Sequence, residues 1–470
     1  MSIYDRAEII GPAATGLTPE LYRRWGRTLG LQVAPGAKFV VGGDARASTP
    51  GFLAALVGGL CEAGLDVVDL GVLPTPMIHY ARRRLDAAGC AIVTASREAP
   101  DTNGLTWMVG DRLPTEKDVR ALKRGAEDDR PAKNERTPTA PRTLDVSFDY
   151  VAWLQERWMG VPAVKRPIVL DGVHGAWACR ARRYLQAIFP HSLFSAIHDT
   201  PGNPSGGPAP DCSRPESLHE LADAVYQERA LLGIAFDGDG DRVAFVDDEG
   251  TPLTAEEATW ILLQSFGGEL SGKPFVYDVK FSDRVPQAAQ ELGAEPLVER
   301  SGPFSVRGRM LKSGAPFGAE TGGHYFFGDL AGGDDGLFAA CRMIAHLAGS
   351  GKTLAKIRRK CPKVFITPDL PVRVKARYRQ EVVRRVRKLW SKYPQTAVDG
   401  VRIELPDGWV LVRNPAAEPA LAFRFESRNW KSLAKLVSKF CDSLPEVGEA
   451  LWASYEDAMG LDYEEDRAQA

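Results

Sequence analysis

The chain alternates short apolar runs with longer segments in which apolar residues recur every three or four positions. Near the N-terminus, residues 38–44 and 63–71 are apolar runs that predict buried strands, and residues 49–64 have the pattern of a helix. A third run, residues 88–96, predicts a strand that leads into a loop. Because strands that alternate with helices form mainly parallel, covered sheets, the pattern predicts an α/β domain.

The same rhythm occurs twice more and then stops. Residues 166–250 and 254–329 each repeat the alternation of apolar strands and helices. After residue 366 the chain changes to a strongly basic helix, residues 373–390, followed by two apolar runs joined by a loop. We therefore expect three related α/β domains with mixed sheets and a smaller C-terminal α+β domain, with bounds at 1–142, 143–252, 253–366 and 367–470.

Two polar segments are expected at the surface. Residues 124–143 are polar and proline-rich with almost nothing to bury, which is typical of a connection between domains. The basic helix at 373–390 would suit an acidic partner, but a solvated helix face is the simpler interpretation.

Composition and charge narrow the class of protein. With 470 residues, 44% of them apolar and 26% charged, the chain has the make-up of a soluble multidomain protein. Its net charge of −2 gives no overall attraction to nucleic acid or to an anionic membrane. It has no apolar run of about 20 residues and no signal-peptide pattern. Its seven cysteines are scattered, as in a reduced compartment. We expect a cytoplasmic protein that binds neither nucleic acid nor membrane.

The stretch DGDGDR carries the clearest chemical signal. Asp237, Asp239 and Asp241 follow an apolar run and are separated only by glycine, so their charges repel one another. A charged surface turn is one interpretation. An EF-hand is a second, but Arg242 and Asp248 stand where that loop needs Gly and Glu. Three carboxylates at the end of a strand can instead converge on one Mg²⁺ ion, which offsets their repulsion, and we favour this interpretation.

Here the sequence resembles the α-D-phosphohexomutases, the family of phosphomannomutases and phosphoglucomutases. DGDGDR is similar to the metal loop of that family. Further motifs occur in the family's order over nearly the whole chain: VGGDARASTP (41–50), GVLPTPM (71–77), TASREAPDTNG (94–104), GAETGGH (318–324) and GWVLVRNPAAEP (408–419). The resemblance implies four domains around a central cleft. It also implies transfer of a phosphoryl group between O1 and O6 of a hexose, through a phosphoserine and a bisphosphorylated sugar.

The resemblance implies catalytic roles for three residues. Ser96 matches the phosphoserine, although alone it would be interpreted as a turn serine. Arg242 is placed to reach the same phosphate. Lys280 stands where the family has a lysine near the transferring oxygens, and a neighbouring cation such as Arg284 would lower its pKa for proton transfer. The implied ligands of one Mg²⁺ ion per chain are Ser96, Asp237, Asp239 and Asp241.

Substrate contacts are implied in the same way. Glu320 and His324 match residues that bind vicinal sugar hydroxyls, although alone they would suit a polar hairpin. The implied substrate-binding residues are Glu320, Gly322, His324, Arg413 and Asn414. The implied partner is a hexose phosphate, with glucose 1,6-bisphosphate or an equivalent as activator, bound by a monomer or a homodimer.

The sequence departs from the family's pattern at functional positions. The departures replace hydrogen-bonding or ionisable side chains of the family's loops: Arg97-Glu98 for His-Asn, Thr106 for Lys, Pro415-Ala416-Ala417 for Ser-x-Thr, Pro303 for His, Gly322 for Ser and Ile10 for Arg. In the phosphate loop only Arg413, Glu418 and Pro419 keep the pattern. Proton transfer would then fall to Glu98 or Lys280.

These departures leave alternatives open. The first is an active phosphohexomutase whose altered pocket is compensated by other cations, among them Arg97, Arg284, Arg307 and Arg424. The second is a diverged member that has lost mutase turnover and binds or senses a sugar phosphate, or regulates a partner. A third is a phosphosugar phosphatase, in which the phosphoserine is hydrolysed. The intact aspartate triad and Ser96 favour phosphoryl transfer.

Overall fold

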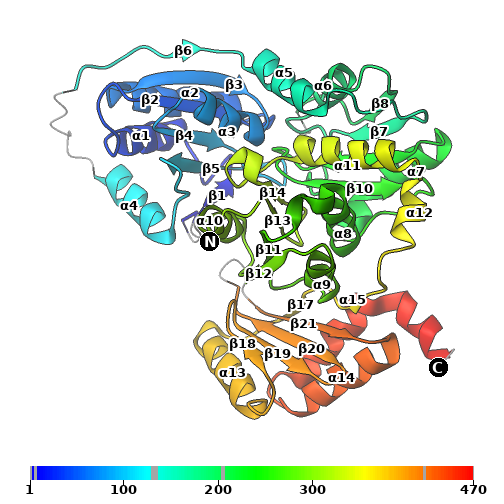
Figure 1. Cartoon of the computed structure of the whole chain (residues 1–470). Coiled ribbons are helices and arrows are strands. Elements are labelled where there is room, and N and C mark those ends of the chain that lie inside the picture. The colour runs from blue at the N-terminus through cyan, green and yellow to red at the C-terminus, as the bar shows by residue number, and fades with distance from the viewer. Residues whose placement is uncertain (1–2, 5–7, 129–135, 203–206, 416–419, 469–470) are drawn as a thin grey trace. The chain divides into compact units, whose positions relative to one another are not determined.

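The computed structural model describes residues 3–4, 8–128, 136–202, 207–415 and 420–468 (Figure 1). The chain divides into two compact units. The first contains Met1–Gly267 and Pro316–Lys360, and the second contains Gly268–Ala315 and Cys361–Ala470. The residues of the expected third domain are therefore divided between the two units.

A six-stranded mixed sheet forms the first domain, as the apolar runs predict. Its strands are β1 (Ile9–Pro12), β2 (Lys38–Gly43), β3 (Asp66–Val72), β4 (Gly89–Val93), β5 (Thr102–Val109) and β6 (Arg142–Thr143). The spatial order is β1-β5-β4-β2-β3-β6. β2 pairs in parallel with β3 and β4, whereas β5 is antiparallel to both β4 and β1. The serine motif leaves this sheet directly after β4.

Two helices pack closely over one face of this sheet (Figure 1). They are α1 (Pro19–Gly30), capped by the Thr18 hydroxyl, and α2 (Thr49–Glu62). Trp25 of α1 and Leu56 of α2 are fully buried in the core between helices and sheet. The helices touch at glycines, because a Cβ atom on Gly59 would lie 1.9 Å from the carbonyl oxygen of Arg23.

The polar segment 124–143 is more closely attached than expected. Its first residues continue α4 (Glu116–Glu127), and its last two form β6 alongside β3. Between them, the guanidinium of Arg136 donates hydrogen bonds to carbonyl oxygens at the C-terminal ends of α1 and α2, those of Gly30, Val33 and Ala63. Polar hydrogen bonds from Arg136 thus attach this segment to the first domain.

The second domain contains a four-stranded sheet in the order β10-β9-β7-β8. Its strands are β7 (Ile168–Asp171), β8 (Phe194–Ile197), β9 (Leu232–Phe236) and β10 (Val243–Asp247). β7 is parallel to β8 and β9, and β10 returns antiparallel to β9. The acidic stretch DGDGDR is the turn between β9 and β10.

Further elements complete the first unit. Three short antiparallel strands, β13 (Phe317–Ala319), β14 (Tyr325–Phe327) and β15 (Gly333–Asp334), carry the GAETGGH motif between the first two. The remaining helices of this unit are α3 (Thr75–Arg84), α5 (Ser147–Trp158), α6 (Ala181–Ile188), α7 (His219–Gln227), α8 (Ala255–Phe266), α11 (Gly336–Ser350) and α12 (Leu354–Arg358).

The second unit contains a parallel pair, β11 (Pro274–Asp278) and β12 (Glu295–Glu299), and a C-terminal α+β domain. That domain has β16 (Phe365–Ile366), β17 (Leu370–Val372), β18 (Gln395–Thr396), β19 (Val401–Leu405), β20 (Gly408–Arg413) and β21 (Leu421–Ser427). The unit's helices are α9 (Arg284–Glu291), α10 (Pro303–Ser313), α13 (Ala376–Leu389), α14 (Trp430–Asp442) and α15 (Gly448–Ala468).

The basic helix lies at the surface of this domain. α13 buries the apolar side chains of Val382, Val383 and Val386, and the side chains of Arg377 and Arg384 are exposed. Among the described residues, no helix is both long enough and apolar enough to cross a membrane.

The contact between α1 and α2 yields a stability prediction. A Gly59→Ala variant should lower the free energy of unfolding by about 1–3 kcal/mol, because its methyl group collides with the backbone of α1. Gly58→Ala is the matched control, since a Cβ there meets nothing within 4 Å. It should raise stability by up to about 1 kcal/mol through helix propensity. Urea unfolding of both variants measures the difference, and equal effects would contradict the close contact.

Candidate active site

The serine loop follows β4 and is held by a buried acid. The hydroxyl of Thr94 donates to Asp44 Oδ2 at 2.7 Å, and its oxygen accepts the backbone N–H of Ser96 at 2.8 Å. Ser96 has a φ of 48°, in the left-handed region that non-glycine residues rarely adopt. Its Oγ donates to Asp237 Oδ2 at 3.1 Å. The turn therefore presents the serine hydroxyl to the acidic loop of the second domain.

Arg46 fixes the shape of this loop. Its side chain is buried and forms an ion pair with Asp44 at 3.0 Å. Its two terminal nitrogens donate to four backbone carbonyl oxygens, at 2.5–3.0 Å, those of Ser96, Glu98, Ala99 and Thr102. Every nitrogen of the guanidinium donates a hydrogen bond, so Arg46 has a structural role.

The acidic turn is stabilised mainly by bonds to one of its three aspartates. Asp237 Oδ1 accepts the backbone N–H groups of Gly240 and Arg242, at 3.0 and 3.2 Å. Asp239 Oδ2 accepts the hydroxyl of Thr75 at 2.7 Å. The other oxygen of Asp239 and one oxygen of Asp241 are buried without a hydrogen-bond partner among the described residues. These two oxygens are the orphaned acceptors of the turn.

The electrostatics of the turn favour a bound cation. Burial raises the pKa of Asp239 and of Asp241 well above the usual range for aspartate. Neighbouring carboxylates raise it further, Asp237 in the case of Asp239 and Asp239 in the case of Asp241. Ligand atoms of all three lie within 4.8 Å of one another. A metal ion would satisfy the orphaned oxygens and offset the repulsion, so the residues present fit one.

Arg242 follows the last aspartate of the turn, and its guanidinium makes only long contacts with the aspartates. Its Nε lies 3.7 Å from Asp237 and 4.0 Å from Asp241, and it is buried without a hydrogen-bond partner in the described ranges. The side chain is 13% exposed. A buried, always charged donor with unused hydrogens is suited to binding an anion such as a phosphoryl group.

The sugar motif lies directly against the acidic turn. In the hairpin between β13 and β14, His324 forms an antiparallel bridge with Arg242, and Gly323 accepts the N–H of Val243 at 3.2 Å. Glu320 and His324 are both buried. Glu320 Oε2 and His324 Nε2 have no hydrogen-bond partner among the described residues. Both groups are thus available for a ligand.

His324 is oriented by a carboxylate. Its Nδ1 lies 2.6 Å from Asp334 Oδ2, on β15, and 3.6 Å from Asp241 Oδ1. A carboxylate accepts, so Nδ1 is the donor and carries hydrogen. In the tautomer with this hydrogen on Nδ1, Nε2 holds the lone pair. Gly322 leaves space beside this histidine, because a Cβ atom there would meet only His324 and Arg242, at 3.9 and 4.0 Å. A Cβ atom would therefore meet no steric clash at this position.

The remaining expected site residues, Lys280, Arg413 and Asn414, belong to the second unit. Lys280 Nζ lies 3.6 Å from Asp278, and Arg284, the expected cationic neighbour, donates instead to Gln287. The charged contact of Lys280 is therefore a carboxylate.

Arg413 is surrounded by acids. Its Nε donates to Asp399 at 2.7 Å, and a terminal nitrogen lies 3.4 Å from Asp369, which also contacts Arg424 at 3.8 Å. Asn414 follows it at half-buried depth. The rest of the expected phosphate loop, Ala416 to Pro419, lies outside the described residues.

Three polar residues of the site were missed by sequence reasoning. Thr75 binds Asp239 through its hydroxyl and its backbone N–H, Asp334 orients His324, and Asp44 supports the serine loop. Thr75 lies in the motif GVLPTPM and Asp44 in VGGDARASTP, both of which were matched to the family. The only sequence signal for Asp334 was a pair of acidic residues, in GGDD, after an apolar hairpin.

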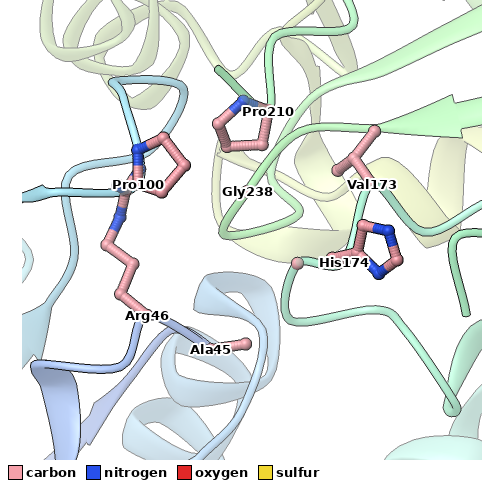
Figure 2. A pocket seen from close by; sticks show the side chains of 8 residues that line it. Ala45, Arg46, Pro100, Val173, His174, Pro210 and Gly238 are labelled. Carbon is pink, nitrogen blue, oxygen red and sulfur yellow. The ribbon is translucent and has the colours of Figure 1, made fainter. Parts of the chain in front are cut away.

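A small cavity lies behind the serine and metal loops. Figure 2 shows Arg46 and Pro100 on one side of it, with Val173 and His174 opposite and Gly238 and Pro210 between them. Its volume is about 20 Å³, room for about one water molecule. The loops therefore pack tightly here, and a sugar phosphate does not fit in this cavity.

Three family models match consecutive parts of the chain. They are described as phosphoglucomutase/phosphomannomutase, alpha/beta/alpha domains I, II and III, and they match residues 4–129, 149–250 and 256–365. Together they account for more than half of the chain. The three α/β domains and the additional C-terminal domain are thus confirmed, while the individual domain bounds stay a prediction.

Relatives match over nearly the whole length. The chain is 28% identical over 460 residues to the phosphomannomutase/phosphoglucomutase of Pseudomonas aeruginosa, covering 96% of this chain and 97% of the relative. It is 26% identical to the phosphoglucomutase of Neisseria gonorrhoeae, covering 96% and 98%. A solved phosphoglucomutase/phosphomannomutase family protein from Burkholderia thailandensis has a TM-score of 0.85 at 27% identity, covering 94% of this chain and 97% of that chain.

The fully hydrogen-bonded guanidinium of Arg46 yields a stability prediction. Arg46→Ala should lower the free energy of unfolding by about 3–5 kcal/mol, because it leaves Asp44 buried without its countercharge. Arg142→Ala is the control, since it removes an exposed pair with Asp66 and should change stability by at most about 1 kcal/mol. Denaturant unfolding measures both, and similar losses in the two variants would refute the structural role of Arg46.

Proposed function

Because the chain belongs to the α-D-phosphohexomutase family, we propose that it moves a phosphoryl group between O1 and O6 of a hexose through a phosphoserine at Ser96. The named relatives are phosphomannomutases and phosphoglucomutases, and the chain is a phosphohexomutase of the isomerase class. The observation that carries our assignment of the nucleophile is the 3.1 Å hydrogen bond from Ser96 Oγ to Asp237. It joins the serine and metal motifs, which are 141 residues apart in sequence.

Asp237, Asp239 and Asp241 would hold one Mg²⁺ ion, with Ser96 as a further ligand. The orphaned oxygens of Asp239 and Asp241 support this assignment, and an all-oxygen set suits Mg²⁺. When bound, Mg²⁺ would offset phosphoryl charge and polarise the phosphoryl oxygens. Arg242, buried beside the same turn, would bind an oxygen of the transferring group.

Glu320 and His324 would bind the sugar hydroxyls. Within the described residues Glu320 Oε2 accepts no hydrogen bond, which suits it to hydroxyl donors. Nε2 of His324 offers a lone pair when Nδ1 donates to Asp334. A hydroxyl that attacks a phosphoryl group must lose its proton, and Nε2 is an acceptor for that proton. This arrangement supplies proton transfer in a chain that lacks the histidine of the serine loop and the lysine at position 106.

Arg413 would bind the phosphate that is not being transferred. Its countercharges, Asp399 and Asp369, keep the buried guanidinium compensated when no anion is present. The same acids compete with a phosphate for the guanidinium, so we propose that this anchor is weaker than an unopposed arginine. A hexose phosphate is the proposed substrate class, with glucose 1,6-bisphosphate or an equivalent as the activator.

The nucleophile can be tested by incorporation of phosphate. Wild-type protein incubated with glucose 1,6-bisphosphate should gain one phosphate by intact-mass analysis, mapped to Ser96. Ser96→Ala should gain none and lose at least about 10³-fold in mutase rate. The control is Ser217→Ala, at an exposed serine, which should behave as wild type. A Ser96→Ala variant that keeps more than about a tenth of the rate would refute the assignment.

Metal binding can be tested separately by thermal unfolding. Mg²⁺ at 100 times its dissociation constant should stabilise the wild type by about 2.7 kcal/mol. Asp239→Asn should abolish most of this gain, while Asp223→Asn, at an exposed aspartate of α7, should keep it. An unchanged response in Asp239→Asn would show that the ion binds elsewhere.

A further inference from the structure

Two arginines contact the serine loop and its surroundings in different ways. Arg46 is buried and donates from every guanidinium nitrogen, at distances of 2.5–3.0 Å. Arg97 directly follows Ser96, and its side chain is 44% exposed. Its polar contacts are long: one terminal nitrogen lies 3.4 Å from Ser213 Oγ and 3.6 Å from Asp211 Oδ2. Arg46 has no donor left to offer a ligand, whereas Arg97 has several that no described residue accepts.

The contact with Asp211 places the Arg97 guanidinium at the junction of two loops. Asp211 follows Pro210, whose carbonyl oxygen accepts the N–H of Gly238, between two of the triad aspartates. A Cβ atom on Gly238 would lie 2.5 Å from the carbonyl oxygen of Ser96 and 2.8 Å from the ring of Pro210. Asp211 is thus next to the point at which the serine loop meets the metal loop.

Asp211 does not depend on Arg97 for its compensation. It is a buried carboxylate, and its Oδ1 accepts from the backbone and hydroxyl of Ser213. Its Oδ2 faces two cations, Arg97 at 3.6 Å and Arg214 at 3.4 Å. Removal of one partner from a buried ion pair is normally costly because the remaining charge is unpaired. Here Arg214 remains near the same oxygen, so Asp211 keeps a cationic partner when Arg97 moves away.

A phosphoryl group on Ser96 would change the balance of charge around Arg97. It adds about −1.5 to −2 charges to a site that already contains three carboxylates. The positive charges that offset these are those of Arg242 and of the divalent cation in the proposed function. The site would still be negative, and Arg97 is a neighbouring guanidinium with unused donors. A dianionic phosphate offers more charge and more acceptor oxygens than the single Asp211 oxygen that Arg97 now contacts.

We propose that Arg97 binds the phosphoryl group carried by Ser96, with Asp211 as the positioning residue that holds its guanidinium beside the loop. Arg97 would exchange its long contact with Asp211 for a charge-assisted hydrogen bond to the phosphate, while Arg214 keeps Asp211 compensated. This inference rests on the proposed role of Ser96. It assigns a phosphate-binding function to a residue that stands where the family's motif has histidine.

The test compares phosphorylation by glucose 1,6-bisphosphate in Arg97→Ala, Arg97→Lys and Arg214→Ala. Arg97→Ala should need about 10- to 100-fold more bisphosphate for half-maximal phosphorylation, the effect of losing a hydrogen bond to a charged group. Arg97→Lys should lie between it and wild type, because a lysine keeps the charge but not the planar fork. Free guanidinium ion should partly restore Arg97→Ala. Arg214→Ala, which removes the other cation on the same Asp211 oxygen, should need less extra bisphosphate than Arg97→Ala, because it weakens the compensation of Asp211 but leaves the phosphate contact in place.

Each result decides between phosphate binding and a purely structural contact. If Arg97→Ala and Arg214→Ala are equally impaired, and guanidinium ion rescues neither, Arg97 acts only through Asp211 and the inference is wrong. If Arg97→Ala is phosphorylated and turns over like wild type, Arg97 does not bind the phosphate. A wild type that takes up no phosphate would overturn this inference together with the role of Ser96, whereas a phosphorylated wild type with an unimpaired Arg97→Ala would overturn this inference alone.

Discussion

Three carboxylates confined in one buried turn are the constraint around which the first unit is arranged. Each charge disfavours the other two, and burial removes the water that would otherwise screen them. The turn therefore needs donors from elsewhere. It receives them from its own backbone, from the hydroxyls of Thr75 and Ser96, and from the guanidinium of Arg242. Because these partners come from separate loops, the acidic turn also fixes where those loops meet.

The polar groups of the site divide into two kinds. Those that shape the loops use all their hydrogen-bonding groups, as Asp44 and Arg46 do. Others are buried with an atom that has no hydrogen-bond partner within the described part of the chain, including Nε of Arg242, Oε2 of Glu320 and Nε2 of His324. A buried donor or acceptor without a partner costs about 1–3 kcal/mol, so folding alone would not retain them. In the proposed function these atoms would bind the ligand without rearrangement, which is how a preorganised site avoids reorganisation.

The sequence was most informative where a pattern is local. The apolar runs predicted the strands on both sides of DGDGDR, because burial on both faces leaves a continuous apolar run. The chain's likeness to a family led to Ser96 and His324, whose roles stay a proposal. The contacts of Thr75 with Asp239 and of Arg97 with Asp211 connect residues 164 and 114 positions apart, and no local periodicity records such a pair. Arg136 was missed for a related reason, because its bonds go to backbone carbonyls, which carry no sequence signal.

The number of hydrogen bonds differs between residues of the loops, and this difference decides where substitutions are tolerated. Residues with several partners across loops, such as Asp44 and Asp237, keep the family's pattern, since a change at either would break bonds in two places at once. The departures at Arg97 and Gly322 fall where the side chain has few partners or open space around it. Substitutions at such positions disturb few of the bonds that hold the loops together. Under the proposed function, substrate preference can therefore change there by single steps, each compatible with a folded protein.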